Sequence, residues 1–356
     1  MDLKPSLRKG SLVARVLEGA WRSSEFPPLD LSEAELDEVT PLLYGSGAAA
    51  LGWRRLSNTN LRETPSAEVL HQAYRLLSLQ SEIHEQKIEK VFRLLREAAV
   101  DAVLGKGWAA AGLYPDRPLR PYGDIDICIR PQHYRLAEEV LKSPELNDCQ
   151  IDLHRHFSEI DERRVEDIFD RSLVVPLRAE KIRTLGAEDH LALLSIHLLK
   201  HGAWRPLWLC DIGAGVESLS PTFNWEICLG RNKTRAGWIV ASIGLAHRLL
   251  GARIDHLAFK GRARELPNWL TENVLKQWAN PFAINQPPMR HPVPMAAQWK
   301  SPSGLLNALR ERWPDPILAT VSVNGSFNSV PRLPYQLANC MSRIVRIATR
   351  SGEADH

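Results

Sequence analysis

The run IDICI at residues 125–129 constrains the fold more than any other feature, because its β-branched residues predict a strand. Asp124 comes directly before this run, and side chains two residues apart in a strand share a face. The carboxylates of Asp124 and Asp126 are therefore predicted to lie side by side, which is typical of a site for Mg²⁺ and a nucleotide's phosphates. Two acids on a solvated strand face would have the same pattern, so the pair alone does not establish a metal site.

A tight turn precedes this strand in the sequence. Residues 100–104 form a short apolar run that ends in Gly105-Lys106-Gly107, and residues 108–113 have the pattern of a starting helix. In a strand, turn and helix of this kind, backbone N–H groups and the lysine side chain can bind phosphate oxygens. A Gly-Lys-Gly turn is also common without a ligand, and this stretch lacks the full P-loop pattern.

A second strand is predicted at residues 149–154, where side chains alternate in character. The connection from the first strand, with a helix predicted at residues 131–142, is long enough to return the chain beside it. Asp152 would then stand next to Asp124 and Asp126 as a third carboxylate. The pattern does not decide whether the two strands are parallel or antiparallel.

Helical patterns dominate the rest of the chain, where apolar residues recur at three- and four-residue intervals. Ser32 and Glu35 have the spacing of a capping box, and the long stretch 67–99 is expected to pack on the sheet. Residues 281–294 are Pro-rich and are predicted to be irregular. The predicted helices are 11–21, 32–44, 67–99, 188–202, 206–216, 224–251, 266–279 and 334–350, and residues 163–177 suggest a helix followed by an extended piece.

The last of these helices, at residues 334–350, is basic and amphipathic, with Leu337, Met341 and Val345 on its apolar face. Such a helix can lie on a membrane or contact a nucleic acid. Packing against the rest of the chain is the more usual reason for an apolar face, and we favour packing here.

His197 and His201 lie one turn apart on the helix predicted at residues 188–202. Two histidines at this spacing can bind zinc, but Leu198 stands where the metalloprotease pattern requires a glutamate. We therefore favour histidines that line a cleft, or that form hydrogen bonds in the core, over a zinc site.

Composition and charge argue against several classes of protein. The 356 residues carry a net charge of +3, which permits an anionic ligand but does not indicate a nucleic-acid-binding surface. Five widely spaced cysteines include no Cys-x-x-Cys pair, which favours reduced cysteines in a cytoplasm over disulfides or zinc. No window reaches the roughly 18 uncharged apolar residues of a membrane span, and the N-terminus lacks the pattern of a secretory signal. We therefore expect a cytoplasmic protein.

Taken together, these motifs resemble those of the uncharacterised nucleotidyltransferase family of bacteria, within the larger DNA polymerase β-like nucleotidyltransferase superfamily. The resemblance covers residues 100–216. Four stretches carry it, namely VLGKGWA at 103–109, LYPD through LRPYGDIDI at 113–127, IDLH at 151–154, and residues 189–211 with His197, His201 and Trp208.

This resemblance implies an α+β fold, with a small mixed nucleotidyltransferase sheet flanked by helices and embedded in a largely helical chain. We accordingly divide the chain into a helical region at 1–99, a nucleotidyltransferase core at 100–180 and a mostly helical region at 181–356. In the superfamily, an Asp-x-Asp pair and a third Asp hold two Mg²⁺ ions, which corresponds here to Asp124, Asp126 and Asp152, with Mn²⁺ as an alternative ion. The superfamily's Gly-Ser turn is replaced by GKGW at residues 105–108.

The activity that the resemblance implies is transfer of a nucleoside monophosphate from an NTP to a hydroxyl-type acceptor, with release of pyrophosphate. The three aspartates would be catalytic as well as metal-binding, because two metal ions can stabilise the attacking and leaving oxygens during in-line attack on phosphorus. An ordinary loop salt bridge is the alternative for each arginine. The residues expected to contact the nucleotide are Gly105, Lys106, Gly107, Arg117, Arg120, Gly123, His154, His197 and His201.

Two other functions stay open. The same fold could bind a nucleotide or a peptide as an accessory protein without transfer, because a fold does not determine an activity. A toxin-like enzyme that modifies tRNA or protein would also carry these motifs. The acceptor has no recognisable pattern of its own, but the modest net charge favours a small molecule, peptide or protein over RNA. Nothing in the sequence indicates an oligomeric state.

Overall fold

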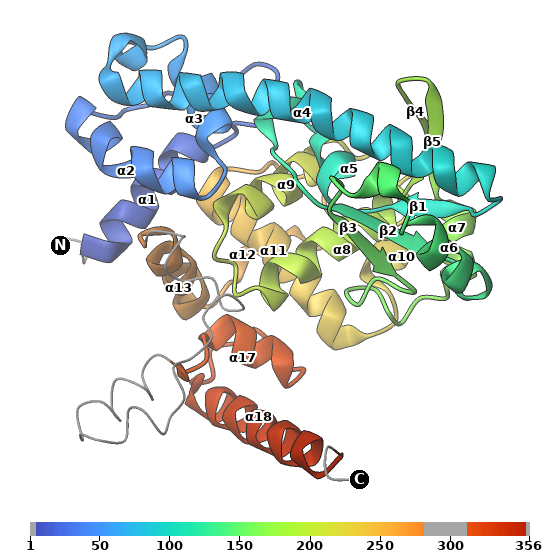
Figure 1. Cartoon of the computed structure of the whole chain (residues 1–356). Coiled ribbons are helices and arrows are strands. Elements are labelled where there is room, and N and C mark those ends of the chain that lie inside the picture. The colour runs from blue at the N-terminus through green and yellow to red at the C-terminus, as the bar shows by residue number, and fades with distance from the viewer. Residues whose placement is uncertain (1–4, 281–311, 354–356) are drawn as a thin grey trace, which may run out of the picture.

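The protein has an α+β fold in which helices surround a five-stranded mixed sheet (Figure 1). The structure is a computed structural model, and it describes residues 5–280 and 312–353. The fold class predicted from the sequence is confirmed. The irregular stretch predicted at residues 281–294 lies outside the described residues.

The sheet has the strand order β3-β2-β1-β5-β4. β2 is antiparallel to β1, whereas β3 is parallel to β2 and β5 is parallel to β1. The hairpin of β4 and β5 completes the sheet on the side opposite β3. The strands are β1 (Ala102–Leu104), β2 (Ile125–Ile129), β3 (Ile151–His154), β4 (Leu173–Leu177) and β5 (Glu180–Thr184), so both strands on which the site prediction rests are confirmed.

β5 is not evident from the sequence, because Glu180, Lys181 and Arg183 give it a charged pattern unlike that of a buried strand. Its backbone nevertheless pairs with β1 on one side and β4 on the other, and these ladders satisfy its N–H and C=O groups whatever its side chains are. We therefore place the end of the sheet at Thr184. The proposed division of the chain at residues 99 and 180 stays a prediction.

The alternation of β2 directs its side chains into two different cores. Ile125, Ile127 and Ile129 pack in a cluster with the second half of α4, whereas Cys128 belongs to a larger cluster that includes α8, α9 and α11. Asp126 shares the face of Cys128, because side chains two residues apart in a strand point the same way. The carboxylate of Asp126 therefore points toward α8 and α9, on the side where the pocket forms.

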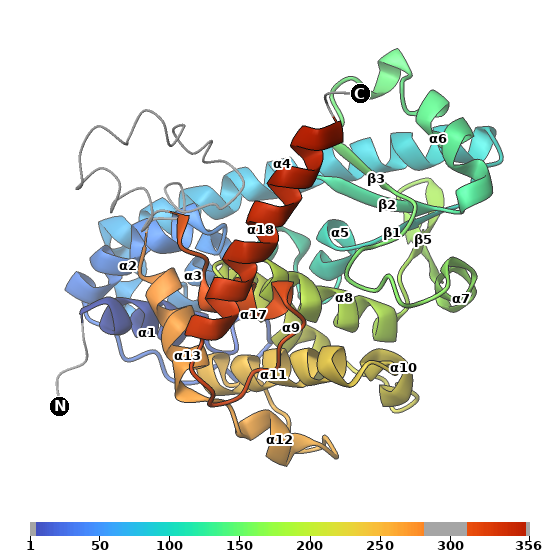
Figure 2. The same cartoon turned by 90° about the horizontal axis from the view of Figure 1, so that it is seen from below.

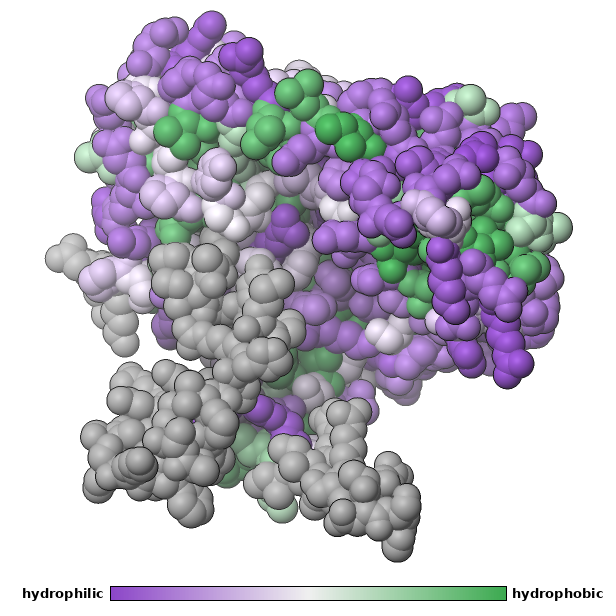
Figure 3. Space-filling view, in the orientation of Figure 1, coloured by the Kyte–Doolittle hydropathy of each residue, from purple (hydrophilic) through white to green (hydrophobic). Residues whose placement is uncertain are grey.

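The long predicted helix is α4 (Pro65–Glu97), which crosses the top of the molecule without a break (Figure 1). Pro65 occupies its first turn and the side chain of Thr64 caps it. The second half packs on the sheet as predicted, through Ile88, Val91, Phe92 and Leu95. Leu76 and Ile83, which the helical spacing assigned to the buried face, are half exposed together with Leu79, and hydrophobic side chains follow the line of α4 in Figure 3.

The remaining helices surround the larger core and the edges of the sheet. The predicted capping box of α2 is present, since Ser32 and Glu35 each accept a hydrogen bond from the other's backbone N–H. The helices before α4 are α1 (Pro5–Leu17), α2 (Glu33–Gly45) and α3 (Ala49–Leu56), and those within the sheet region are α5 (Gly107–Ala111), α6 (Tyr134–Val140) and α7 (Val165–Arg171). After the sheet come α8 (Ala187–Lys200), α9 (Pro206–Glu217), α10 (Trp225–Leu229), α11 (Lys233–Leu250), α12 (Lys260–Arg264) and α13 (Asn268–Trp278).

The chain ends in α17 (Pro316–Ser322) and α18 (Leu333–Glu353). The predicted packing of the apolar face of α18 is wrong for Leu337 and Met341, which are 48% and 67% exposed. The reason is the position of α18, which contacts α17 but lies below the rest of the molecule and crosses its lower face (Figures 1 and 2). Among the helices that the structure describes, none is both long enough and apolar enough to cross a membrane.

Candidate active site

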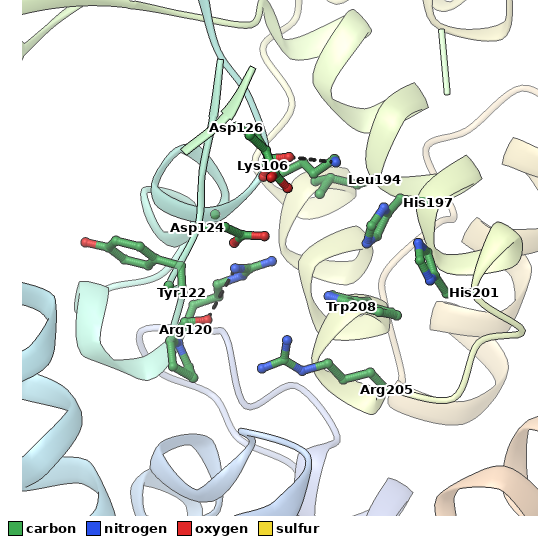
Figure 4. A pocket seen from close by; sticks show the side chains of 14 residues that line it. Lys106, Arg120, Tyr122, Asp124, Asp126, Leu194, His197, His201, Arg205 and Trp208 are labelled. Carbon is green, nitrogen blue, oxygen red and sulfur yellow. Dashed lines mark hydrogen bonds and ion pairs between the residues drawn. The ribbon is translucent and has the colours of Figure 1, made fainter. Parts of the chain in front are cut away.

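A cavity of about 530 Å³ lies between the sheet and the helices α8 and α9. One wall consists of the β1–α5 turn, the segment that leads into β2, and β3, while α8 and α9 form the opposite wall (Figure 4). The cavity brings together most of the site residues predicted from the sequence. These are Lys106, Gly107, Arg120, Gly123, Asp124, Asp126, Asp152, His197 and His201.

The three predicted aspartates enter this cavity from two neighbouring strands. Asp126 on β2 and Asp152 on β3 are directly paired in the register of the parallel ladder. Asp126 is only 2% exposed, whereas Asp152 is exposed. Asp124 comes just before β2 and is also exposed. The parallel pairing therefore places the third carboxylate beside Asp126, as the sequence suggested.

Three potential metal ligands cluster at this point. A carboxylate oxygen of Asp126, one of Asp152 and a ring nitrogen of His154 lie within 4.8 Å of one another. Asp124 lines the same cavity but lies outside this group. Carboxylate oxygens suit Mg²⁺ and Mn²⁺, whereas imidazole is more typical of zinc and the later transition metals. The donor set therefore fits a divalent cation held mainly by carboxylates.

Asp126 is the most tightly bound of the carboxylates. Its Oδ1 lies 2.8 Å from Nζ of Lys106 and 3.2 Å from Nε2 of His154. Burial raises the pKa of Asp126, but the hydrogen bonds with His154 and Lys106 outweigh burial, and the net pKa is lowered. Asp126 is therefore ionised at neutral pH, which is the state that a metal ligand requires.

Lys106 directly precedes α5 and has a φ of +48°, a backbone conformation that is uncommon outside glycine. Its Nζ binds Asp126 and also lies 3.9 Å from Oε1 of Glu159. Burial lowers the pKa of Lys106, but the charges of Asp126 and Glu159 more than compensate, so the net pKa is raised. The ammonium group is thus charged and held by two carboxylates. Its predicted contact with phosphate stays a prediction.

His197 on α8 and His201, directly after its last residue, both line the cavity, as we favoured from the sequence. Nδ1 of His197 lies 3.2 Å from Oε1 of Glu159, and the rings of His197 and His201 are 4.4 Å apart between centroids. Burial, reinforced by the nearby His197, lowers the pKa of His201 to about 4, so this ring is neutral at pH 7. Burial raises the pKa of Glu159, but His197 and Lys106 outweigh it and hold the pKa well below its ordinary value.

Arg120 is 5% exposed and its charge is already compensated within the protein. Its Nη2 lies 2.8 Å from Oδ2 of Asp211, and its Nε lies 3.2 Å from both carboxylate oxygens. Tyr114 donates a further hydrogen bond of 2.8 Å to Asp211, which is fully buried. Arg120 thus reaches the cavity as one half of a buried ion pair.

Three predicted nucleotide-binding residues do not line the cavity. A Cβ at Gly105 would lie 2.7 Å from Cζ of Phe157, so this glycine allows the buried Phe157 ring to pack against the turn. Arg117 lies over the Trp108 ring and belongs to a separate cleft. His154 contacts Asp126 from β3 instead of facing the cavity directly. The predicted roles of these residues stay untested.

Several residues of this site were not predicted as site residues. Arg205 and Trp208 line the cavity from α9, while Glu159 and Asp211 bind cationic side chains that line it. Helical spacing could not have found Arg205, because α8 ends at Lys200 and α9 begins only at Pro206, so Arg205 belongs to neither helix. Glu159 has no such spacing either, because it lies in the irregular segment after β3.

The comparisons with known proteins agree with this arrangement. A family described as uncharacterised nucleotidyltransferase matches residues 32–251, which is more than half of the chain. The match includes α2 to α4, the whole sheet and both walls of the cavity. Searches of curated proteins and of solved structures found no significant match.

Proposed function

Because the chain belongs to the uncharacterised nucleotidyltransferase family, we propose that this cavity transfers a nucleoside monophosphate from an NTP to a hydroxyl-type acceptor and releases pyrophosphate. One observation carries the proposal. The register of β2 and β3 sets Asp126 against Asp152, and Asp124 opens into the same cavity. Such a group of carboxylates beside several basic side chains is suited to a metal-bound triphosphate.

The metal site would be formed by Asp126 and Asp152, with Asp124 and His154 at its margins. The distance of at most 4.8 Å among ligand atoms of Asp126, Asp152 and His154 supports a divalent cation there, and the predominance of oxygen favours Mg²⁺ or Mn²⁺. When bound, such cations stabilise the negative charge that develops on the attacking and leaving oxygens.

The chain's own residues then have separate tasks. Asp152 is exposed on the edge strand β3, where an acceptor hydroxyl can reach it, and we assign it the proton that this hydroxyl loses. Lys106 and Arg120 contribute positive charge beside the triphosphate, and Gly107 and Gly123, which line the cavity, allow the nucleotide to approach the backbone. His197 and His201 form the opposite wall against the acceptor or the nucleoside.

Release of pyrophosphate tests this proposal. Purified protein, Mg²⁺, each of the four NTPs and pools of small hydroxyl compounds, peptides and proteins should give pyrophosphate only when the matching acceptor is present. Asp126→Asn should reduce the rate by at least about 100-fold, because the charge that positions the cation is lost. Asp148→Asn is a matched control, since Asp148 is an exposed aspartate that pairs with Lys87 and Lys90 outside the cavity.

Binding of NTP and Mg²⁺ without pyrophosphate from any pool would contradict transfer and would support an accessory binding protein. Equal rates for wild type and Asp126→Asn would contradict the assignment of the metal site.

A further inference from the structure

Arg205 reaches the cavity from the start of α9. It is the residue before Pro206, the first residue of this helix, and its backbone is extended with a φ of −98° and a ψ of 110°. This conformation follows from the proline, which disfavours the helical region for the residue before it. In Figure 4 the guanidinium group of Arg205 points into the cavity, toward Arg120 and Asp124.

The helical region before the sheet holds this side chain in place. Nε of Arg205 donates a hydrogen bond of 2.8 Å to the carbonyl oxygen of Ser46, between α2 and α3. The next residue, Gly47, has a φ of +77°, and a Cβ there would lie 2.5 Å from Nη2 of Arg205. Glycine at this position therefore leaves room for the guanidinium group. The anchor uses Nε and not the two terminal nitrogens, and the guanidinium group as a whole points into the cavity (Figure 4).

Arg205 differs from Arg120 and Lys106, whose charges are each compensated by a carboxylate in contact with them. Asp211 binds Arg120, and Asp126 with Glu159 binds Lys106. Within residues 5–280 and 312–353, by contrast, no carboxylate lies within 4.0 Å of a nitrogen of Arg205. Burial, together with repulsion from Arg120, lowers the pKa of Arg205 to about 10, so the group still carries its charge at pH 7.

The position of Arg205 relative to the aspartates defines which part of a substrate it faces. Asp126 has Asp152 and His154 on the β3 side, while Asp124 lies at the start of β2 next to Gly107. Arg205 faces the Asp124 side. A half-buried, uncompensated guanidinium group in this place is suited to an anion, and its planar pair of N–H donors matches a phosphate.

We propose that Arg205 binds the β- or γ-phosphate of the NTP, on the Asp124 side of the metal-binding aspartates. This assignment rests on the proposed function, and it adds the orientation of the NTP in the cavity. Pyrophosphate would form beside Asp124, Arg120 and Arg205, and the acceptor would enter from the side of Asp152 and His154.

Titration calorimetry in the presence of Mg²⁺ tests the assignment with three probes, namely an NTP analogue that cannot be cleaved at the α-phosphate, inorganic pyrophosphate, and the corresponding NMP. Arg205→Gln should weaken binding of the analogue and of pyrophosphate about 10- to 100-fold, because a charge-assisted hydrogen bond is lost. Binding of the NMP, which lacks these phosphates, should be unchanged. Arg205→Lys keeps the charge without the planar pair of donors, and its affinity for the analogue and for pyrophosphate should lie between those of the wild type and Arg205→Gln.

Arg54→Gln is the matched control, because Arg54 is also half-buried and bonds to backbone carbonyls, but it lies outside the cavity. Thermal melts of all variants show whether the fold is retained, and the lysine variant keeps the test usable if the glutamine variant does not fold. Unchanged affinity of Arg205→Gln for the analogue and pyrophosphate would overturn the assignment, and so would an equal loss for the NMP.

A higher KM for the acceptor with unchanged affinity for the analogue would show that Arg205 binds an anionic acceptor, and would likewise overturn the triphosphate assignment. Wild-type protein that binds none of the three probes would instead overturn the proposed function, and no Arg205 variant is needed to see that outcome.

Discussion

Replacing Asp211 by asparagine tests how the cavity is supported, because this change removes one charge of a buried pair and keeps the side chain's shape. Asp211 is fully buried, Arg120 is 5% exposed, and their shortest contact is 2.8 Å. Asp211 also accepts a hydrogen bond from Tyr114. Asp211→Asn leaves the Arg120 guanidinium group buried without a counter-charge, and it can set the amide N–H₂ against this guanidinium group, which only donates hydrogen bonds.

Removing one partner of a buried ion pair costs about 3–5 kcal/mol, and we expect a loss of this size in the free energy of unfolding. The total stability of a typical protein is only about 5–15 kcal/mol, so the change would be large in urea denaturation at pH 7. Asp255→Asn is a control of the same type, because Asp255 binds Arg264 at 2.6 Å on the surface. An exposed pair contributes only about 0–1 kcal/mol.

A second variant separates the charge effect from lost packing. In Arg120→Met/Asp211→Leu both charges are absent, so stability should recover most of what Asp211→Asn loses, apart from the hydrogen bond of Tyr114. A loss below about 1 kcal/mol in Asp211→Asn would refute the argument that Arg120 depends on Asp211 for its counter-charge. No recovery in the double variant would show that shape, and not charge, explains the effect.

Two further predictions concern residues next to the site. Burial lowers the pKa of His190 from 6.5 to about 4, so the unfolded chain binds this proton first as the pH falls, and stability present above pH 6.5 is lost on the way to pH 4. Between pH 7.5 and pH 5 this histidine should lower the free energy of unfolding of the wild type by about 2 kcal/mol. In urea denaturation at these two pH values, His190→Leu should show a smaller decrease than the wild type. An equal decrease would contradict a lowered pKa for His190. Gly105→Ala places a Cβ 2.7 Å from the ring of Phe157, which is fully buried, so overpacking should lower stability by about 1–3 kcal/mol. An unchanged melting temperature of Gly105→Ala would show that the ring can move aside.

The parts of the fold that the sequence predicts are those with a local pattern. The run at residues 125–129 predicts β2, and the helical period of residues 67–99 predicts α4. The capping box at Ser32 marks the start of α2. β5 has no such pattern, because three of its five residues, Glu180, Lys181 and Arg183, are charged, and its place depends on pairing with β1 and β4. Its position can be seen only after the other strands are in place.

The site shows the same division between local and distant information. Asp124 and Asp126 look equivalent in the sequence, yet one precedes β2 and is exposed while the other lies in the strand and is buried. The partners of the basic residues are far away along the chain, since Arg120 binds Asp211 and Arg205 binds the carbonyl oxygen of Ser46. No local pattern links such pairs, so the sequence identified the carboxylates but not the buried groups that fix the charges around them.

The central claim is that the cavity transfers the α-phosphoryl group of an NTP together with its nucleoside. The most direct measurement compares NTP labelled at the α-phosphate with NTP labelled at the γ-phosphate, using wild type and Asp126→Asn with Mg²⁺ and the acceptor found by pyrophosphate release. We predict that the α label appears in the acceptor, that the γ label appears in pyrophosphate, and that Asp126→Asn shows neither. Appearance of the γ label in the acceptor, or transfer at the wild-type rate by Asp126→Asn, would contradict the account.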